Sequence, residues 1–267
     1  IYDRLRNDPG LRFDTKEEVV AAAQDAMDRA KAAIPDWFGR LPQADCVMAE
    51  IPETGAQDAP IAYYLPPATD GSRPGAYFIN ATEPRTRTRF ESEALAFHES
   101  IPGHHLQLAI AQELENLPEF RKHALVTVYV EGWGLYAERL ADEMSLYSGP
   151  LQRMGMLSFD SWRAGRLVVD IGMHALGWSK QEAIDYLVEN SPLALNNIES
   201  EVERYIGMPG QALAYMLGRL EIMKLRTEAM RSMGSRFDIQ AFHDTVLTSG
   251  PVPLGVLGDR IRAWASR

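Results

Sequence analysis

The sequence predicts a mainly helical protein with one small β-sheet near its N-terminal third. Its 267 residues are 46% hydrophobic, which is enough apolar material to bury a full core as one large domain. Short β-prone runs are confined to residues 44–80, where Pro, Gly and Asp separate them. From residue 90 onward, apolar residues recur at three- and four-residue spacing, as they do in amphipathic helices.

The N-terminal part, residues 1–43, is expected to be a helical lead-in. Thr15 is followed three positions later by Glu18, the spacing of a capping box, and apolar residues then recur to position 34. The sheet is expected to consist of hairpin-linked strands, with residues 66–75 as a loop between two of them. The strand segments are CVMAEI, IAYYL and GAYFIN.

The helical body, residues 90–267, is expected to carry the functional residues. A turn is predicted around Pro192, and Gly155, Gly165, Gly172 and Gly207 weaken parts of the helical pattern. The sequence contains no internal repeat and no long linker, so residues 1–267 are taken as a single domain. The predicted helices span about 90–115, 119–146, 151–176, 179–188, 198–230 and 238–247.

Composition excludes several classes of function. The formal charge of −10 and the pI near 5.1 argue against nucleic acid and anionic lipid as partners, because both bind basic surfaces. No segment approaches the roughly 20 apolar residues of a membrane helix, so membrane insertion is not expected. The single cysteine, Cys46, excludes an internal disulfide, and any metal must be held by histidines and carboxylates.

The chain begins at Ile1 rather than at a methionine, which indicates a processed product or a piece of a longer polypeptide. The sequence does not indicate the compartment or the oligomeric state.

Three of the six histidines lie close together in FHESIPGHHLQ. A zinc peptidase helix carries two histidines at i and i+4, with a glutamate after the first that takes a proton from water. His98 and Glu99 fit this pattern, but Pro102 stands where the second histidine belongs and is expected to break the helix. The second ligand is then His104 after a local loop, which we favour, or His105. A pair that only starts a new helix and binds nothing is the third alternative.

The third ligand is predicted to be Glu131, in VYVEGWGLYAERL on the next helix of an antiparallel pair. Its neighbours Val130, Trp133 and Leu135 are apolar, which favours a buried carboxylate over a solvated one. Glu138, seven residues further on, is placed to orient a ligand histidine.

These motifs resemble the gluzincins, metallopeptidases whose zinc is held by two histidines and a glutamate. Four segments in order, HESIPGHHLQ, EGWGLYAERL, RLVVDIGMH and RYIGMPGQALAYMLG, also resemble a bacterial family called domain of unknown function 885. The resemblance covers most of the chain from Pro74 onward. It implies a helical, zinc-metallopeptidase-like catalytic domain with one Zn²⁺ per chain. Because members of that family are longer, it also implies that this chain is the C-terminal half of a protein whose N-terminal half is missing.

Other polar residues are candidates for supporting roles. Tyr205 is the first choice for a group that stabilises an oxyanion, and Tyr215 is a second candidate, expected to bind substrate. Tyr77 lies in GAYFIN, a strand whose backbone could pair with an extended peptide. The basic run Arg85–Arg89 is expected to be a solvated loop rather than a binding patch, and His123 and His243 are taken as ordinary histidines.

One helix face carries polar residues at three- to four-residue spacing. Its two arginines could bind the terminal carboxylate of a substrate, with the other two residues supporting the site, or all four could form a buried ion-pair network. These residues are Arg163, Arg166, Asp170 and His174.

Hydrolysis of a peptide bond by metal-activated water is therefore the predicted function, with Glu99 as the general base. The alternatives are a metal-dependent hydrolase of a non-peptide amide or ester, and a non-catalytic, peptidase-like binding module. The expected partners are a peptide substrate and the missing N-terminal half of the same protein.

Overall fold

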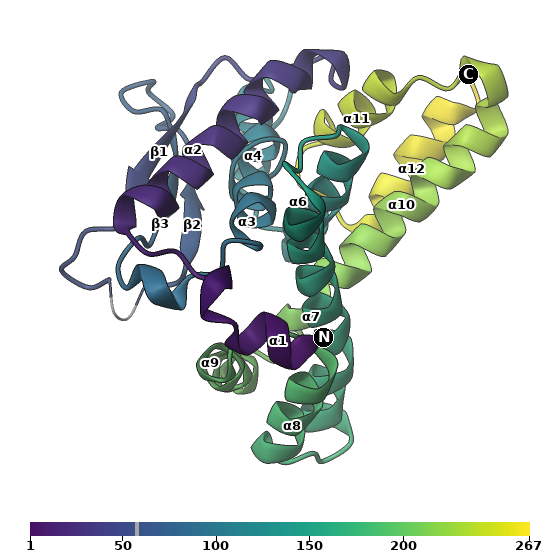
Figure 1. Ribbon diagram of the computed structural model, residues 1–267. Coiled ribbons are helices and arrows are strands. Elements are labelled where there is room, and N and C mark those ends of the chain that lie inside the picture. The colour runs from purple at the N-terminus through teal and green to yellow at the C-terminus, as the bar shows by residue number, and fades with distance from the viewer. Residues whose placement is uncertain (57–58) are drawn as a thin grey trace.

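A computed structural model describes residues 1–56 and 59–267 and confirms a mainly helical fold with a small sheet. The sheet and α2 lie on one side of the molecule, α6 runs through the middle, and α10 to α12 lie on the other side (Figure 1). The strands are β1 (Cys46–Glu50), β2 (Ala62–Leu65) and β3 (Gly75–Ile79). The helices are α1 (Tyr2–Asn7), α2 (Lys16–Ala33), α3 (Ser92–Glu99), α4 (His104–Gln112), α5 (Glu119–Lys122), α6 (Thr127–Glu143), α7 (Pro150–Ala175), α8 (Lys180–Asn190), α9 (Leu195–Gly207), α10 (Ala214–Met233), α11 (Ile239–Leu247) and α12 (Leu254–Ala265).

The N-terminal helices are fixed by side-chain contacts. Thr15 caps α2 as predicted, because its hydroxyl accepts a hydrogen bond from the backbone N–H of Glu18 at 3.3 Å. The shorter α1, which was not predicted separately, is tied to the end of α8 and the segment after it, where Arg6 donates to the carbonyl oxygens of Val188, Ser191 and Leu193.

The strand pairing differs from the predicted hairpins. The order is β1-β3-β2, with β1 parallel to β3 and only β2 antiparallel to it. Because β2 lies on the far side of β3 from β1, β1 and β3 can run parallel although only one strand separates them in the sequence. Because β3 is the central strand, neighbours occupy both of its edges, so GAYFIN has no free edge for an extended peptide.

The predicted helical body is confirmed, but three of its segments are divided. The first breaks between α3 and α4 around Pro102, as expected, and the second divides into α5 and α6. The third breaks between α9 and α10, where Gly210 has a φ of 82° that favours glycine. The 26-residue α7 continues through its three glycines, and α12 was not predicted.

Helices α6 and α10 cross at two facing glycines. A side chain at Gly132 would collide with the backbone of Gly218, and one at Gly218 would collide with the carbonyl oxygen of Val128. The two backbones can therefore approach closely.

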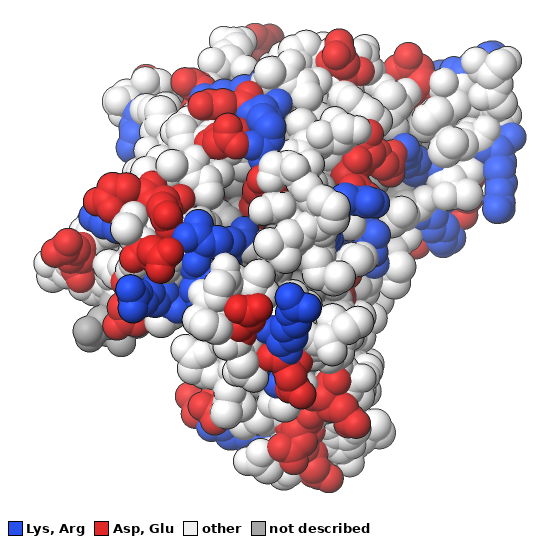
Figure 2. Space-filling model, in the orientation of Figure 1, with Lys and Arg blue, Asp and Glu red and all other residues white. Residues whose placement is uncertain are grey.

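The main core joins α2, the sheet, α3, α4, α6 and α10 to α12, and a smaller cluster holds α7, α8 and α9 together. None of the described helices combines the length and the apolar character needed to cross a membrane. On the face that Figure 2 shows, acidic and basic side chains are interspersed.

Candidate metal centre

The break after α3 brings two histidines together. His98 lies in the last turn of α3, and His104 is the first residue of α4. Two hydrogen bonds hold the intervening loop: the N–H of His105 donates to the Ser100 carbonyl at 3.0 Å, and the Trp133 indole donates to the Pro102 carbonyl at 2.9 Å. The His98 and His104 rings consequently stand nearly perpendicular, with centroids 4.7 Å apart.

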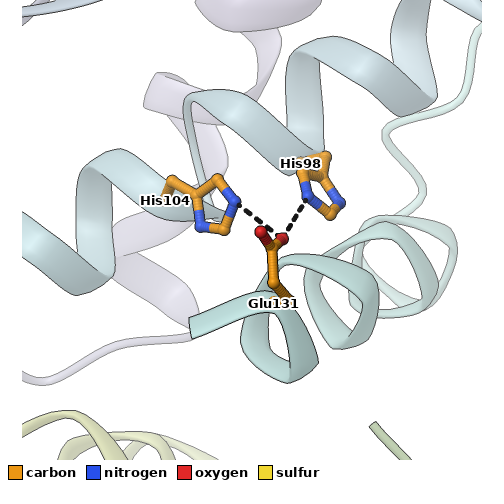
Figure 3. Close-up of side chains that lie close together, drawn as sticks. All are labelled: His98, His104 and Glu131. Carbon is orange, nitrogen blue, oxygen red and sulfur yellow. Dashed lines mark ion pairs between the residues drawn. The ribbon is translucent and has the colours of Figure 1, made fainter. Parts of the chain in front are cut away.

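Glu131 on α6 completes a cluster of three potential ligands (Figure 3). Its Oε2 lies 3.6 Å from Nε2 of His98 and 3.5 Å from Nε2 of His104. A tetrahedral zinc ion with bonds of about 2.0–2.1 Å separates its ligand atoms by about 3.3–3.5 Å. The two distances from Glu131 are thus close to this separation, and the three potential ligand atoms all lie within 4.8 Å of one another. The side chains provide nitrogen and carboxylate donors, which zinc accepts.

The cluster carries charge although it is buried. Burial alone would lower the pKa of His98, but Glu131 and Glu138 outweigh it and raise this pKa to about 9. Burial would raise the pKa of Glu131, but His104 and His98 outweigh it and hold this pKa well below its usual value. Glu131 therefore stays ionised, as a metal ligand must.

Glu138 lies where the sequence placed it, behind His98. Nδ1 of His98 donates to Oε1 of Glu138 at 2.7 Å, which directs Nε2 toward Glu131. Glu138 is almost fully buried, and Nη2 of Arg163 lies 3.7 Å from its Oε1. Gly134 leaves room for both rings, because a side chain there would collide with His98 and His104.

Glu99 follows His98 and is partly buried next to the cluster. Burial raises its pKa above the usual range, and Glu131 adds to this effect, whereas His104, His98 and Arg163 oppose it. The hydroxyl of Tyr77 is buried near the Glu99 carboxylate. Burial raises the pKa of Tyr77, and the charge of Glu99 raises it further. A carboxylate with a raised pKa accepts a proton more readily near neutral pH.

His105 points away from the cluster. Its Nε2 donates to the Ala44 carbonyl at 3.1 Å, and its Nδ1 accepts from the Tyr64 hydroxyl at 2.9 Å. Burial lowers its pKa to about 4. Of the two histidines that the sequence left open, the structure therefore brings His104 to His98 and Glu131 and places His105 against the sheet.

The two candidate tyrosines differ from expectation. Tyr205 is fully buried, and its hydroxyl accepts hydrogen bonds from Arg166 at 2.7 Å and from the Trp162 indole at 3.0 Å. Tyr215 is instead the tyrosine beside the cluster: its partly exposed ring stacks on His98 with centroids 6.2 Å apart. The rings of both tyrosines lie against the guanidinium group of Arg166, but the hydroxyl of Tyr205, the first choice, is engaged by Arg166 and Trp162.

The polar face of α7 is engaged in internal contacts. Arg166 pairs with Glu201 at 2.8 Å, Asp170 accepts from the backbone N–H of Gly210, and His174 donates to the Tyr205 carbonyl at 3.0 Å. The contacts of Arg166 and Asp170 resemble the buried-network alternative, whereas His174 is exposed, and Nε and Nη1 of Arg163 have no hydrogen-bond partner within the described residues. Sequence reasoning missed Glu201 and also Trp162, whose ring contacts the guanidinium groups of both Arg163 and Arg166. The four-residue spacing from Glu201 to Tyr205 was the available signal.

Two solved structures resemble the chain. A protein of Colwellia psychrerythraea provisionally named a lipoprotein is 36% identical, with a TM-score of 0.94 over 98% of this chain and 46% of that one. A lipoprotein of unknown function from Shewanella oneidensis, also provisionally named, is 20% identical, with a TM-score of 0.81 over 97% of this chain and 48% of that one, a likeness in fold alone. The chain therefore spans about half the length of both proteins.

A comparison with curated proteins finds no match. The family model described as "Bacterial protein of unknown function (DUF885)" matches residues 1–261. This match begins well before Pro74, where the resemblance seen in the motifs begins, and it covers nearly the whole chain. The chain belongs to this bacterial family of unknown function.

Proposed function

We propose that the chain is a zinc-dependent hydrolase that cleaves peptide bonds, with the metal held by His98, His104 and Glu131. One observation carries the proposal: two buried histidines and an ionised carboxylate bring their ligand atoms within 4.8 Å of one another, and both histidine–carboxylate distances, 3.6 and 3.5 Å, are close to those around a tetrahedral ion. The support from Glu138 behind His98 is also typical of metal sites, in which a carboxylate fixes the orientation of a ligand imidazole.

A bound zinc ion would act as a Lewis acid that polarises the scissile carbonyl and lowers the pKa of water. Glu99 takes a proton from the attacking water as the new C–O bond forms. It then transfers this proton to the leaving nitrogen as the C–N bond breaks. The raised pKa of Glu99 suits both steps, because the group must accept a proton and release it again.

The oxyanion of the tetrahedral intermediate needs a hydrogen-bond donor. We assign this role to Tyr215 instead of Tyr205, because Tyr215 stacks on His98, whereas the hydroxyl of Tyr205 is occupied by Arg166 and Trp162. The phenol stays protonated at neutral pH, since burial raises the pKa of Tyr215.

Elemental analysis tests the metal. We expect about one zinc per chain in protein purified without added metal, and its loss in His98→Ala and Glu131→Ala. Turnover tests the base: Glu99→Gln should keep the zinc and lower the hydrolysis of a peptide library by about 10²- to 10⁴-fold. Glu115→Gln, which changes an exposed glutamate, is the matched control.

Undiminished activity of Glu99→Gln would contradict the assigned base. No stoichiometric zinc, even when zinc is supplied, would reject the metal site and favour a non-catalytic binding module. Zinc with turnover of model esters or amides, but of no peptide, would favour the non-peptide hydrolase.

A further inference from the structure

A second candidate site lies beside α3, the helix that carries His98 and Glu99. A cavity of about 40 Å³ is enclosed by the segment before α2, the end of β3, the first turn of α3, α7 and the connection from α8 to α9. This volume holds roughly three water-sized groups. Most of its wall is apolar, including Leu95 of α3 and Phe159 of α7, and the exposed Thr86 marks its mouth.

Two arginines bring unsatisfied donors to this cavity. Nη1 of Arg12 and Nε of Arg87 are buried and have no hydrogen-bond partner within residues 1–56 and 59–267. The other terminal nitrogen of Arg12, Nη2, donates to the carbonyl of Arg6. Arg87 is the middle arginine of the basic run that was expected to be solvated, and that expectation was wrong for this residue. Buried N–H groups without partners are uncommon in folded proteins, and a ligand is one explanation for them.

The acidic side chain in the same wall does not satisfy these donors. Glu91 accepts hydrogen bonds from the hydroxyls of Thr88 and Ser158 instead. Burial raises the pKa of Glu91, with opposition from the two hydroxyls and from Arg12. The cavity thus combines two guanidinium groups with a single carboxyl group that is already hydrogen-bonded.

A ligand that fits must be small and negatively charged. It needs two acceptor atoms for the two arginines and an apolar part that packs against the apolar wall. A carboxylate on a short aliphatic chain has these properties, and guanidinium groups recognise it through paired hydrogen bonds. A phosphate has four oxygens, and besides the two arginines the wall offers the buried hydroxyl of Ser92, which has no partner in the described part of the chain, whereas most of its surface is apolar and would leave further oxygens without donors.

We propose that this cavity binds the carboxylate of a short aliphatic acid, held by Arg12 and Arg87. The carboxylate has two possible sources, a free small acid or the acidic end of a substrate. Leu95 lies one turn before Glu99 on α3, and Phe159 lies one turn before Arg163 on α7, so the cavity is next to the proposed reaction site. Only the second source rests on the proposed function.

Titration with sodium propionate, followed by ligand-observed NMR, tests the site in the intact chain. We expect millimolar binding that weakens about tenfold or more in Arg87→Gln, because a charge-assisted hydrogen bond is lost. Arg85→Gln, from the same basic run but exposed, should bind propionate like the wild type. Propionamide has the same shape without the charge and should bind about tenfold more weakly to the wild type, a comparison that needs no variant.

The two sources are separated by turnover. Competitive inhibition by propionate of a peptide with a free carboxyl end, but not of its amidated form, assigns the carboxylate to the substrate. Binding of propionate without any effect on turnover, or in a chain that hydrolyses nothing, assigns the site to a free acid. The proposal is overturned if propionate binds no more tightly than propionamide, or if Arg87→Gln leaves its affinity unchanged in protein whose circular dichroism is that of the wild type.

Discussion

His104 and His105 are adjacent in the sequence and both are buried, yet His104 has charged neighbours and His105 has neutral hydrogen-bond partners. His104 faces Glu131 and His98 in a charged cluster. His105 lies between a tyrosine hydroxyl and a backbone carbonyl, both neutral, and its pKa falls to about 4. In the charged cluster the pKa of His98 rises to about 9. Both regions are buried, so the difference between the two pKa shifts comes from the charge of the neighbouring groups.

His243 shows that the neutral arrangement recurs. Its Nδ1 donates to the Trp37 carbonyl at 2.8 Å, and its Nε2 accepts from the Tyr136 hydroxyl at 2.8 Å. Its ring stacks on Phe38 with centroids 4.7 Å apart, and burial lowers its pKa to about 4. A buried histidine with a carbonyl and a phenol as partners is satisfied without a charge, and it therefore serves as a core residue.

The largest expected effect tests directly whether His104 and His105 differ in zinc binding. His104→Asn should lower zinc affinity on the order of a thousandfold, because the roughly 10–16 kcal/mol of a structural zinc site is shared among three or four ligands. His105→Asn should leave the zinc content unchanged. Competition with a chromogenic chelator measures both. Equal losses in the two variants would show that the two regions are not distinct.

A second prediction concerns acid stability. The folded pKa of about 4 for His105 and His243 lies below the unfolded value of about 6.5, so the unfolded chain takes up the protons first as the pH falls. Their contribution is complete above pH 6.5 and is lost toward pH 4. As the pH falls from 6.5 to 5, each histidine should lower the free energy of unfolding by about 2 kcal/mol. Urea denaturation measures this slope.

The control for this prediction is a variant that lacks one neutral histidine. His243→Gln should be less stable at pH 7, but its stability should fall less steeply between pH 6.5 and 5. An unchanged slope would mean that His243 does not remain neutral in the folded protein. In the metal-free chain, His98 should act in the opposite direction, because its raised pKa adds stability that is lost as the pH rises from 6.5 through 9.

The smallest expected effect sharpens the role of the carboxylates. Glu138→Gln keeps a hydrogen-bond acceptor for His98 but removes the charge, and it should weaken zinc binding by about 10- to 100-fold. Glu143→Gln, on the same helix but paired with Arg226 near the surface, should not change it. Isothermal titration with zinc compares the two variants, and equal affinities would remove Glu138 from the support of the site.

Local sequence patterns predicted much of the fold. The cap at Thr15, the extent of α7, the region of the sheet and the break at Pro102 all depend on residues close together in the chain. The pairing of β1 with β3 depends on contacts about 29 positions apart and was missed. Helix α12 was also missed, because its periodic pattern is short and contains Gly255 and Gly258.

The candidate site shows the same limit. Spacing was enough to indicate His98, Glu131 and the support from Glu138. It could not choose between His104 and His105, because the loop that directs them is held by Trp133, a residue of another helix. The choice between Tyr205 and Tyr215 meets the same limit, because the contacts of Tyr205 with Arg166 and Trp162, and of Tyr215 with His98, join different helices.

The facing glycines of α6 and α10 have an evolutionary consequence. Glu131 precedes Gly132 by one residue, so the position of this carboxylate depends on how closely the two helices approach. An alanine at either glycine would push the helices apart, and a second alanine opposite would not compensate, because each methyl group meets backbone. Descendants of this sequence that keep Glu131 at the histidines are therefore expected to inherit both glycines together.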